Sequence, residues 1–376
     1  TVDGGTIKLD GNYPVGTDNV ALGNAALDSL VSGNYSTAIG ANALTASTAS
    51  SNTGVGFAAL EANISGTQNT AIGMQALTDN TTANNNVAVG HRAMFVNTTG
   101  SVNVAVGAIA LSSNTTGDYN TGVGYGSLEL NTTGEQNTAV GRLALRGNTT
   151  GTLNVAMGVN ALFANTTGSS NIAIGTQALT YNTTASNNTA VGYQAGYSNT
   201  TGGYNTFLGH QSGFASNHSS DAFANNTFVG ALSGSTITTG RKNTIIGLYN
   251  GNQGGLDIRT SNNNIVLSDG DGNARGYYEG GIGSPLWKFN TPTAYQNSMH
   301  IDNTSVTNPY GPAIRFTGAA PNNMGQYFLV CADSAADKMK IWSNGNVVNT
   351  NNGYGAISDV KLKENIIDAS SQWDDI

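Results

Sequence analysis

The stretch of residues 103–119, N-V-A-V-G-A-I-A-L-S-S-N-T-T-G-D-Y, decides the fold because close copies of it recur along most of the chain. Its opening Asn returns every 17 residues, at positions 52, 69, 86, 103, 120, 137, 154, 171, 188 and 205. Gly follows four residues after each of these, and a second Asn, the one that opens Asn114-Thr115-Thr116-Gly117, keeps the same period. A fixed period of this kind indicates a stack of equivalent structural units.

A unit of 17 residues is too short for two helices and a turn, but it suits one coil of a parallel β-solenoid. Val104 and Val106 should face one side of a short strand and Ala105 the other. We expect two or three such strands in each coil, with coils about 4.8 Å apart. Asn114 or Gly117 should take a positive φ in the Asn-Thr-Thr-Gly turn. The fold class predicted is therefore all-β, a parallel β-solenoid or β-roll of repeats.

The recurring Asn residues are predicted to stack as an amide ladder inside the solenoid. The members expected in this ladder are Asn69, Asn86, Asn103, Asn120, Asn137, Asn154 and Asn171.

The repeat has few bulky apolar side chains, so burial in a lone chain should barely offset the entropy lost on ordering each coil. We therefore expect three copies to pack together through the small-residue face that contains Ala105. The alternative is one broad solenoid with a filled interior, for which the chain has few large apolar residues.

Composition excludes several classes of function. Charged residues make up 10% of the chain and the net charge is −8, with no basic stripe, so nucleic acid and membrane surfaces are not expected partners. The single cysteine, Cys331, excludes an intrachain disulfide framework. The histidines lack metal-ligand spacing, and Asp269-Gly270-Asp271-Gly272-Asn273 fails the EF-hand pattern. We expect no metal and no cofactor.

The repeat fades toward the C-terminal third. Short β-type runs occupy residues 286–289, 313–316, 327–331 and 339–342, and Asn344-Gly345 is typical of a hairpin turn. The domains expected are a lead-in at 1–18, the repeat rod at 19–267, a Gly- and Asp-rich connector that forms turns at 268–283, a β-rich knob at 284–357 and a final segment at 358–376.

Aromatic residues around the connector are candidates for ligand binding. Tyr277, Tyr278, Trp287 and Phe289 could stack on a sugar ring, and the alternative is that they form the core between chains. The rod is nearly free of carboxylates, so no pair of them suits glycoside hydrolysis. The chain is accordingly not expected to be an enzyme in its assembled form.

Two resemblances to known families bear on function. The Asn-x-Ala-Val/Ile-Gly core, over about residues 19–250, resembles the head repeats of trimeric autotransporter adhesins, which form a trimeric left-handed β-roll. The longer unit through Asn-Thr-Thr-Gly resembles repeats of phage tail-fibre proteins.

The final segment, 358–376, resembles the start of the self-cleaving intramolecular chaperone of phage endosialidases, tail spikes and fibres. That resemblance implies a scissile bond between Ser358 and Asp359, Ser358 as nucleophile and Lys363 as base. Only the beginning of the chaperone is present. Taken without the resemblance, the same residues are typical of a capped helix start.

These resemblances imply a structural and receptor-binding phage tail fibre. As a homotrimer joined to other tail proteins, it would attach the virion to a bacterial surface glycan or protein, outside the cell. The first alternative is a trimeric adhesin at the bacterial cell surface, and the second is a polysaccharide-degrading tail spike. Any catalysis would be a single self-cleavage in the full-length precursor.

Overall fold

The computed structural model describes residues 18–218, 223–279, 286–289, 327–332, 337–342 and 347–349. The chain divides into two units, Thr1–Ser298 and Met299–Ile376. Every regular element among the described residues is a β-strand. The strands of the first unit are β1 (Val20–Leu22), β2 (Thr37–Ile39), β3 (Thr53–Val55), β4 (Thr70–Ile72), β5 (Val87–Val89), β6 (Val104–Val106), β7 (Thr121–Val123), β8 (Thr138–Val140), β9 (Val155–Met157), β10 (Ile172–Ile174), β11 (Thr189–Val191), β12 (Thr206–Leu208), β13 (Thr227–Val229), β14 (Thr244–Ile246), β15 (Asn252–Gln253), β16 (Leu256–Asp257), β17 (Ile265–Ser268), β18 (Ala274–Glu279) and β19 (Leu286–Phe289).

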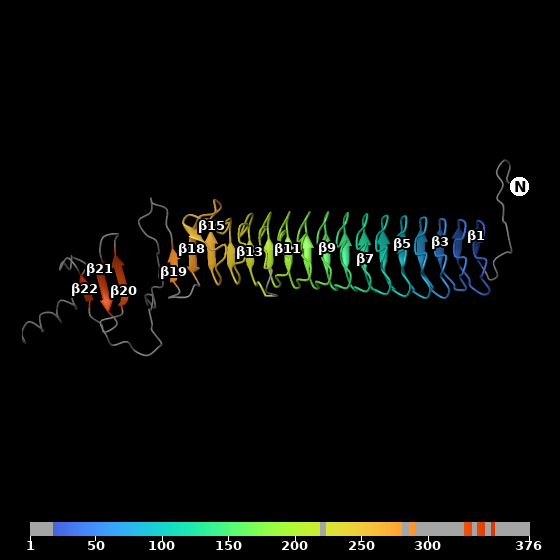
Figure 1. Ribbon diagram of the computed structural model, residues 1–376, viewed down its shortest axis with the longest axis horizontal. Helices are drawn as coiled ribbons and strands as arrows, with labels where there is room; N and C mark the ends of the chain where they lie inside the picture. Colours follow the sequence, from blue (N-terminus) through green and yellow to red (C-terminus); the bar gives the residue numbers. More distant parts are fainter. Residues whose placement is uncertain are drawn as a thin grey trace, which may run out of the picture. The chain divides into compact units, whose positions relative to one another are not determined.

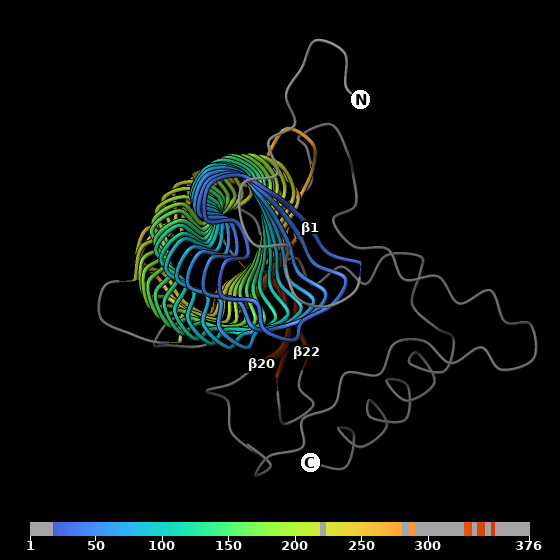
Figure 2. The same cartoon turned by 90° about the vertical axis from the view of Figure 1, so that its right-hand side faces the viewer.

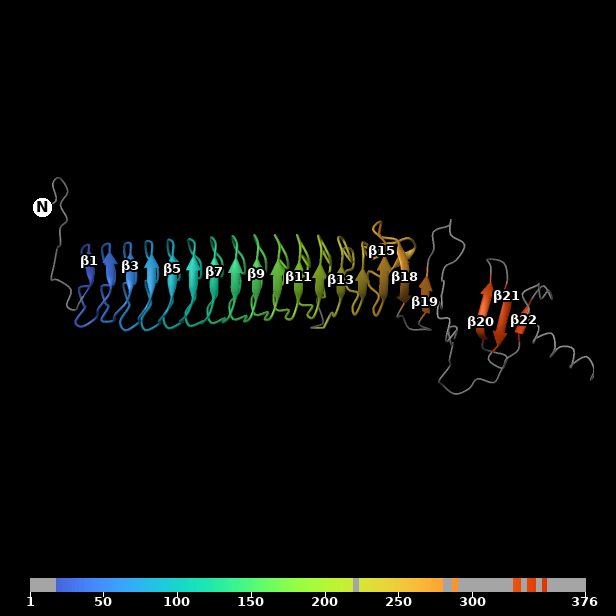
Figure 3. The ribbon, with the colours of Figure 1, turned by 180° about the vertical axis from the view of Figure 1, so that it is seen from behind.

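Strands β1–β14 and β17 form one parallel sheet in chain order, each strand paired with its equivalent in the next coil. Val104 of β6 pairs with Thr121 of β7, for example, and Ala105 with Gly122. The strands therefore stack along the axis of a solenoid (Figures 1 and 3), and the view along that axis superposes the coils (Figure 2). The prediction of a parallel β-solenoid is confirmed.

Each regular coil contains one three-residue strand, not the two or three that the sequence predicted. The remainder of the coil is a chain of turns whose backbone groups bond directly to the next coil. Leu111 N–H donates to the Ser127 carbonyl at 2.9 Å, and Thr115 N–H to the Thr132 carbonyl at 2.9 Å. Coil-to-coil pairing thus satisfies the turn backbone as a sheet would.

The interior of each coil is filled by small side chains and one leucine. Ala105, Ala110 and Leu111 are all fully buried within this single chain. A Cβ placed on Gly122, which follows Ala105 in the sheet, would lie 3.5 Å from Leu111 Cδ1. Leucine therefore fills the space beneath the strand and leaves room only for Ala or Gly there.

The expectation that Ala105 faces another chain is therefore wrong. The chain curls back on itself within 17 residues, so the small-residue face is enclosed by its own coil. The outward face of each strand instead carries the larger residues, such as the half-buried Val104 and exposed Val106.

Toward the C-terminal end, the large and small interior positions exchange places. Strands β12 and β13 carry the fully buried Phe207 and Phe228 where earlier strands carry Ala or Gly. Gly213 and Gly234 stand where earlier coils carry Leu, and a Cβ on Gly234 would lie 2.5 Å from Phe228 Cδ2. The exchange keeps the interior filled to the same extent, as close packing requires.

The parallel sheet ends in two antiparallel strands. β18 pairs with β17 through a bulge at Leu267/Ser268, and β19 pairs with β18. A six-residue strand thus occupies much of the segment expected to be turns, and it covers the last parallel edge. β15 and β16 form a separate antiparallel pair beside the last coils.

In the second unit, β20 (Tyr327–Ala332), β21 (Asp337–Trp342) and β22 (Val347–Asn349) form an antiparallel sheet. The β-type runs predicted at 327–331 and 339–342 are therefore strands. The run predicted at 313–316 lies outside the described residues.

One longer coil buries a histidine. Asn226 N–H bonds to Asn205 across 21 residues, and His218, from within this coil, is only 2% exposed. His218 Nε2 lies 2.9 Å from the Gly240 carbonyl oxygen, and Nδ1 lies 3.5 Å from Ser216 Oγ. Burial lowers the pKa of His218 and the positive charge of Arg241 lowers it further, against the opposing effect of the Gly240 bond.

This buried imidazole predicts a pH-dependent stability. Because the pKa of His218 is lower in the folded chain than the value of about 6.5 expected when unfolded, the native state binds fewer protons. Its contribution is fully present above pH ~6.5 and is lost as the pH falls below that value toward the folded pKa. Thermal unfolding followed between pH 8 and 5 should show a falling melting temperature. His218→Asn should flatten that slope, and an identical slope in the variant would contradict the assignment.

Candidate functional site

The outward side of the parallel sheet carries a continuous apolar column, here called the outer strand ribbon. It consists of the third residue of β1–β14 and of β17, which is Val, Ile, Leu or Met in every case. Its members are Leu22, Ile39, Val55, Ile72, Val89, Val106, Val123, Val140, Met157, Ile174, Val191, Leu208, Val229, Ile246 and Leu267.

Many members of the ribbon are strongly exposed in the single chain. Exposure reaches 42% for Met157 and 49% for Ile246. The first residue of each of these strands is Thr, Val or Ile, so the whole face lacks charge. Soluble monomers rarely expose contiguous apolar patches larger than a few hundred Å². The outer strand ribbon therefore has the character of an interaction surface.

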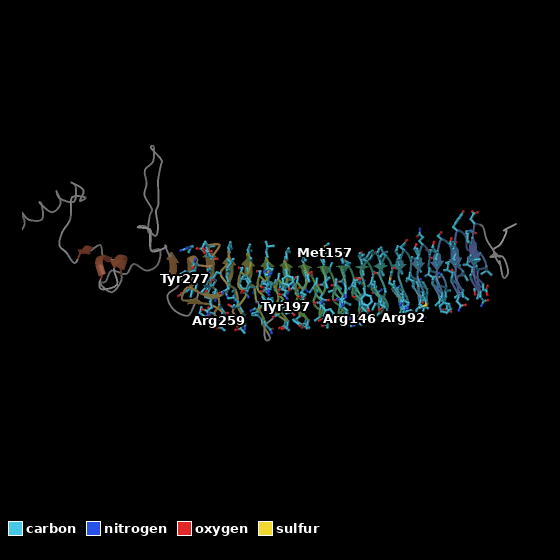
Figure 4. The ribbon with its side chains drawn as sticks, turned by 90° about the horizontal axis from the view of Figure 1, so that it is seen from above. Arg92, Arg146, Met157, Tyr197, Arg259 and Tyr277 are labelled. Atoms are coloured by element: carbon cyan, nitrogen blue, oxygen red, sulfur yellow. The ribbon has the colours of Figure 1, made fainter. Side chains whose placement is uncertain are left out.

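The side of the solenoid away from this ribbon has a different chemistry. Figure 4 shows Met157 of the ribbon at one edge of the rod and Arg92, Arg146 and Arg259 at the other. Each coil has one residue directly after the interior Leu position, which Met94, Gly196, Gly213 and Gly234 occupy in place of Leu in their coils. We call the column of these following residues the turn column. Its members are Phe95, Ser112, Glu129, Arg146, Phe163, Thr180, Tyr197, Phe214 and Ser235.

Neighbours in the turn column contact one another across the coil step. Arg146 Nε donates to Glu129 Oε2 at 2.6 Å, and the Arg146 guanidinium lies 5.7 Å from the centre of the Phe163 ring. At the other end of the column, the Tyr197 and Phe214 rings stack with centroids 5.1 Å apart and planes 1° apart. The strand spacing of about 4.8 Å thus places equivalent aromatic side chains at stacking distance.

Tyr181 extends this aromatic group by one coil. Its ring meets Tyr197 edge-on at 5.0 Å, and Tyr197 Oη donates to Tyr181 Oη at 3.4 Å. That hydrogen bond raises the pKa of Tyr197. Tyr181, Tyr197 and Phe214 together are here called the aromatic platform (Tyr197 is labelled in Figure 4).

A hollow of about 490 Å³ adjoins the platform at Phe214. Its polar lining includes Ser235, Thr236, Asp257 and Arg259. Arg259 holds Asp257 with a two-point fork, Nε to Oδ1 at 2.9 Å and Nη2 to Oδ2 at 2.7 Å. The bond to Arg259 lowers the pKa of Asp257, so its carboxylate is ionised at neutral pH.

The predicted ladder residues Asn69, Asn86, Asn103, Asn120, Asn137, Asn154 and Asn171 are all almost fully buried. Asn120 N–H donates to Asn103 Oδ1 at 2.8 Å, and Asn120 Nδ2 donates to the Gly134 carbonyl at 2.8 Å. The ladder is part of the core and takes no part in a surface site. A second buried ladder, through Asn97 and Asn114, runs beside it with an amide-to-amide bond of 2.8 Å.

Of the predicted aromatic binding residues, Tyr277 and Tyr278 do not line the hollow. Tyr277 packs against the solenoid core, and the strand register places Tyr278 opposite Trp287 and Phe289 opposite Gly276. Ser358, Asp359 and Lys363 lie outside the described residues. Within the part of the chain that the structure describes, no group of three or more His, Cys, Asp or Glu could hold a metal.

Sequence reasoning missed the aromatic platform and the hollow. The available signal was the 17-residue offset between Tyr197 and Phe214, which places them in one column of the solenoid. Asp257 and Arg259 gave no such signal because they lie where the repeat breaks.

Comparisons with protein-family models, curated proteins and solved structures found no match for this chain. In the described residues, no helix is long and apolar enough to span a bilayer.

Proposed function

We propose that this chain is a rod-forming fibre protein that assembles as a homotrimer and attaches a phage virion to a bacterial surface. The observation that carries the proposal is the outer strand ribbon, an uncharged apolar face that continues through every coil. The viral setting, and self-cleavage of a precursor by Ser358 and Lys363 before Asp359, come from the resemblances in the sequence and are part of the same proposal.

The geometry of the ribbon favours a parallel, in-register partner of the same kind. Successive ribbon residues are one coil apart, so a second copy in register meets an equivalent apolar side chain at every step. At about 4.8 Å per coil, the ribbon is about 70 Å long. Each coil adds buried apolar surface to an interface of this length. Three copies related by a closed threefold axis would each bury the ribbon against the other two.

Charge placed on the ribbon should separate the chains. The wild type is expected to sediment at three times the 38.4 kDa mass of one chain. Val106→Glu with Val140→Glu should yield monomers, because burying these unpaired carboxylates between chains is costly. Sedimentation velocity measures the mass, and far-ultraviolet circular dichroism checks that the coils remain folded.

The matched control changes the same two coils on another face. Thr116→Glu with Thr150→Glu adds the same charge at exposed turn positions and should leave the trimer intact. A monomeric wild type, or a trimer that survives the ribbon substitutions, would remove the basis of the proposal.

A further inference from the structure

We propose that the hollow beside Phe214 is a binding subsite for an uncharged sugar unit of a surface glycan, with the aromatic platform supporting neighbouring units. The inference rests on the proposed attachment function and names the ligand class of that function.

The ring of Phe214 supplies the apolar part of the subsite. Tyr197, from the preceding coil, stacks on one side of this ring. The residues that line the hollow with it, among them Ser235 and Arg259, come from later in the chain. The ring therefore has one side supported by Tyr197 and contributes to the wall of the hollow. A pyranose presents a face of C–H groups, which packs favourably on a rigid aromatic surface.

The pair of Asp257 and Arg259 supplies the polar part. The fork uses Arg259 Nε and Nη2, and the Arg259 backbone N–H also donates to Asp257 Oδ1 at 3.1 Å. Nη1 and the second lone pair of Oδ2 take no part in these bonds. Donor and acceptor groups held at fixed spacing match adjacent sugar hydroxyls, each of which both donates and accepts. Ser235 and Thr236 add further hydroxyl groups to the lining.

Charge favours an uncharged ligand. The two charged groups of the hollow neutralise each other, so a neutral sugar loses no ion pair on binding. An acidic sugar would have to compete with Asp257 for Arg259, and the chain as a whole carries a net charge of −8.

The position in the fold supports a binding role over a packing role. Asp257 ends β16, in the β15–β16 pair that departs from the regular coil. Departures from a repeat are not needed to stack coils, and binding residues often occupy such loops on a rigid scaffold. A peptide added as an extra strand fits less well, since β2–β14 are each paired on both sides.

The test uses the full chain and an array of immobilised oligosaccharides, with neutral glucose, galactose, mannose and N-acetylglucosamine series beside sialylated and uronate-containing series. Calorimetry then follows the strongest neutral oligosaccharide. Phe214→Ala and Arg259→Ala should each weaken binding at least about tenfold, the loss expected when one anchor of a small site is removed. Arg259→Lys should also weaken binding because it keeps the charge but loses the fork.

The control for the ring is Phe163→Ala, which removes the same side chain at the same place in the coil, away from the hollow. It should bind as the wild type does. Circular dichroism and sedimentation of every variant exclude misfolding and loss of the trimer.

Neutral oligosaccharide binding that is equal in wild type, Phe214→Ala and Arg259→Ala would overturn the subsite and leave the attachment function standing. Preference for acidic series would overturn the ligand class. Binding to bacterial cells that is abolished by protease digestion of the cells and not by periodate oxidation of their glycans would also overturn it, in favour of a protein receptor. Failure to bind any array sugar or any of a panel of bacteria would count against both proposals.

Discussion

Gly107→Ala is expected to destabilise the solenoid by about 2–6 kcal/mol, combining backbone strain with steric overlap. Gly107 has a φ of 137°, a conformation that L residues rarely adopt. A Cβ there would lie 2.6 Å from the Gly124 carbonyl carbon and 2.6 Å from its oxygen. The next coil cannot move away, because Gly124 N–H donates to the Val106 carbonyl at 2.7 Å.

Hydrogen exchange measured by mass spectrometry is the suitable readout, because long repeat arrays need not unfold in one step. Amides of β6 and β7 should lose protection by about thirtyfold or more, as 2 kcal/mol or more implies. The loss should fade in coils farther along the solenoid, since each coil contacts only its neighbours.

The matched control is Gly126→Asn, also at a positive φ. Gly126 has a φ of 62°, and the equivalent residue of another coil, Asn160, has a φ of 57°. A Cβ on Gly126 approaches the end of the Leu143 side chain, not a backbone atom. Little loss of protection is expected. If both variants lost exchange protection equally, the loss would come from replacing a glycine of positive φ. The close approach of Gly107 to the next coil would then not be its cause.

Much of this fold could be predicted from the sequence. The recurring Asn and Gly positions give the 17-residue period, and the alternation of Val104, Ala105 and Val106 indicates the strand. Polar and apolar residues follow nearly the same order in each copy of the repeat, so a structure inferred for one copy applies to the others. The direction of burial was missed because the closure of a coil on itself depends on its turns.

Those turns use conformations that residue preferences do not predict. Ile109 and Leu111 have φ values of 53° and 52°, and Tyr119 has 58°. The sequence favoured Asn114 or Gly117 for a positive φ, but neither adopts one. Left-handed conformations cost an apolar residue about 1–2 kcal/mol. At Leu111, full burial and a backbone bond to the next coil offset this cost, and both arise only once coils are stacked.

The candidate binding site was less predictable than the rod. Phe214 is one residue of a repeat, but its partners Asp257 and Arg259 come from a segment without periodicity. Only the folded chain brings these residues to one hollow. The sequence instead favoured aromatic residues outside the repeat as binding residues, but one of them, Tyr277, packs against the core.

Loss of a ladder amide should have an effect of similar size to the glycine substitution. Asn120→Leu keeps the side-chain volume and removes the polar group. Asn137 N–H then loses its acceptor, Asn120 Oδ1 at 3.0 Å, and is left buried without a partner. The Gly134 carbonyl loses one of two donors. Asn137 Nδ2 also loses its 3.1 Å bond to Asn120 Oδ1 and keeps its bond to the Gly151 carbonyl. One orphaned donor and two lost bonds should cost about 2–6 kcal/mol, measured as reduced exchange protection of β7 and β8.

The two ladders meet at that carbonyl, so their amides should not act independently. Asn120 Nδ2 and Asn131 Nδ2 both donate to Gly134 O, at 2.8 Å and 2.9 Å. Asn120→Leu alone or Asn131→Leu alone leaves the Gly134 carbonyl with one amide donor. The double variant, Asn120→Leu with Asn131→Leu, leaves this buried oxygen with neither. The double loss should therefore exceed the sum of the single losses by about 1–2 kcal/mol.

Asn120→Leu with Asn97→Leu is the control, because Asn97 donates to Gly100 O and shares no acceptor with Asn120. That pair should be additive. Additivity in both pairs would mean that the two ladders stabilise the solenoid separately, and that the shared carbonyls do not couple them.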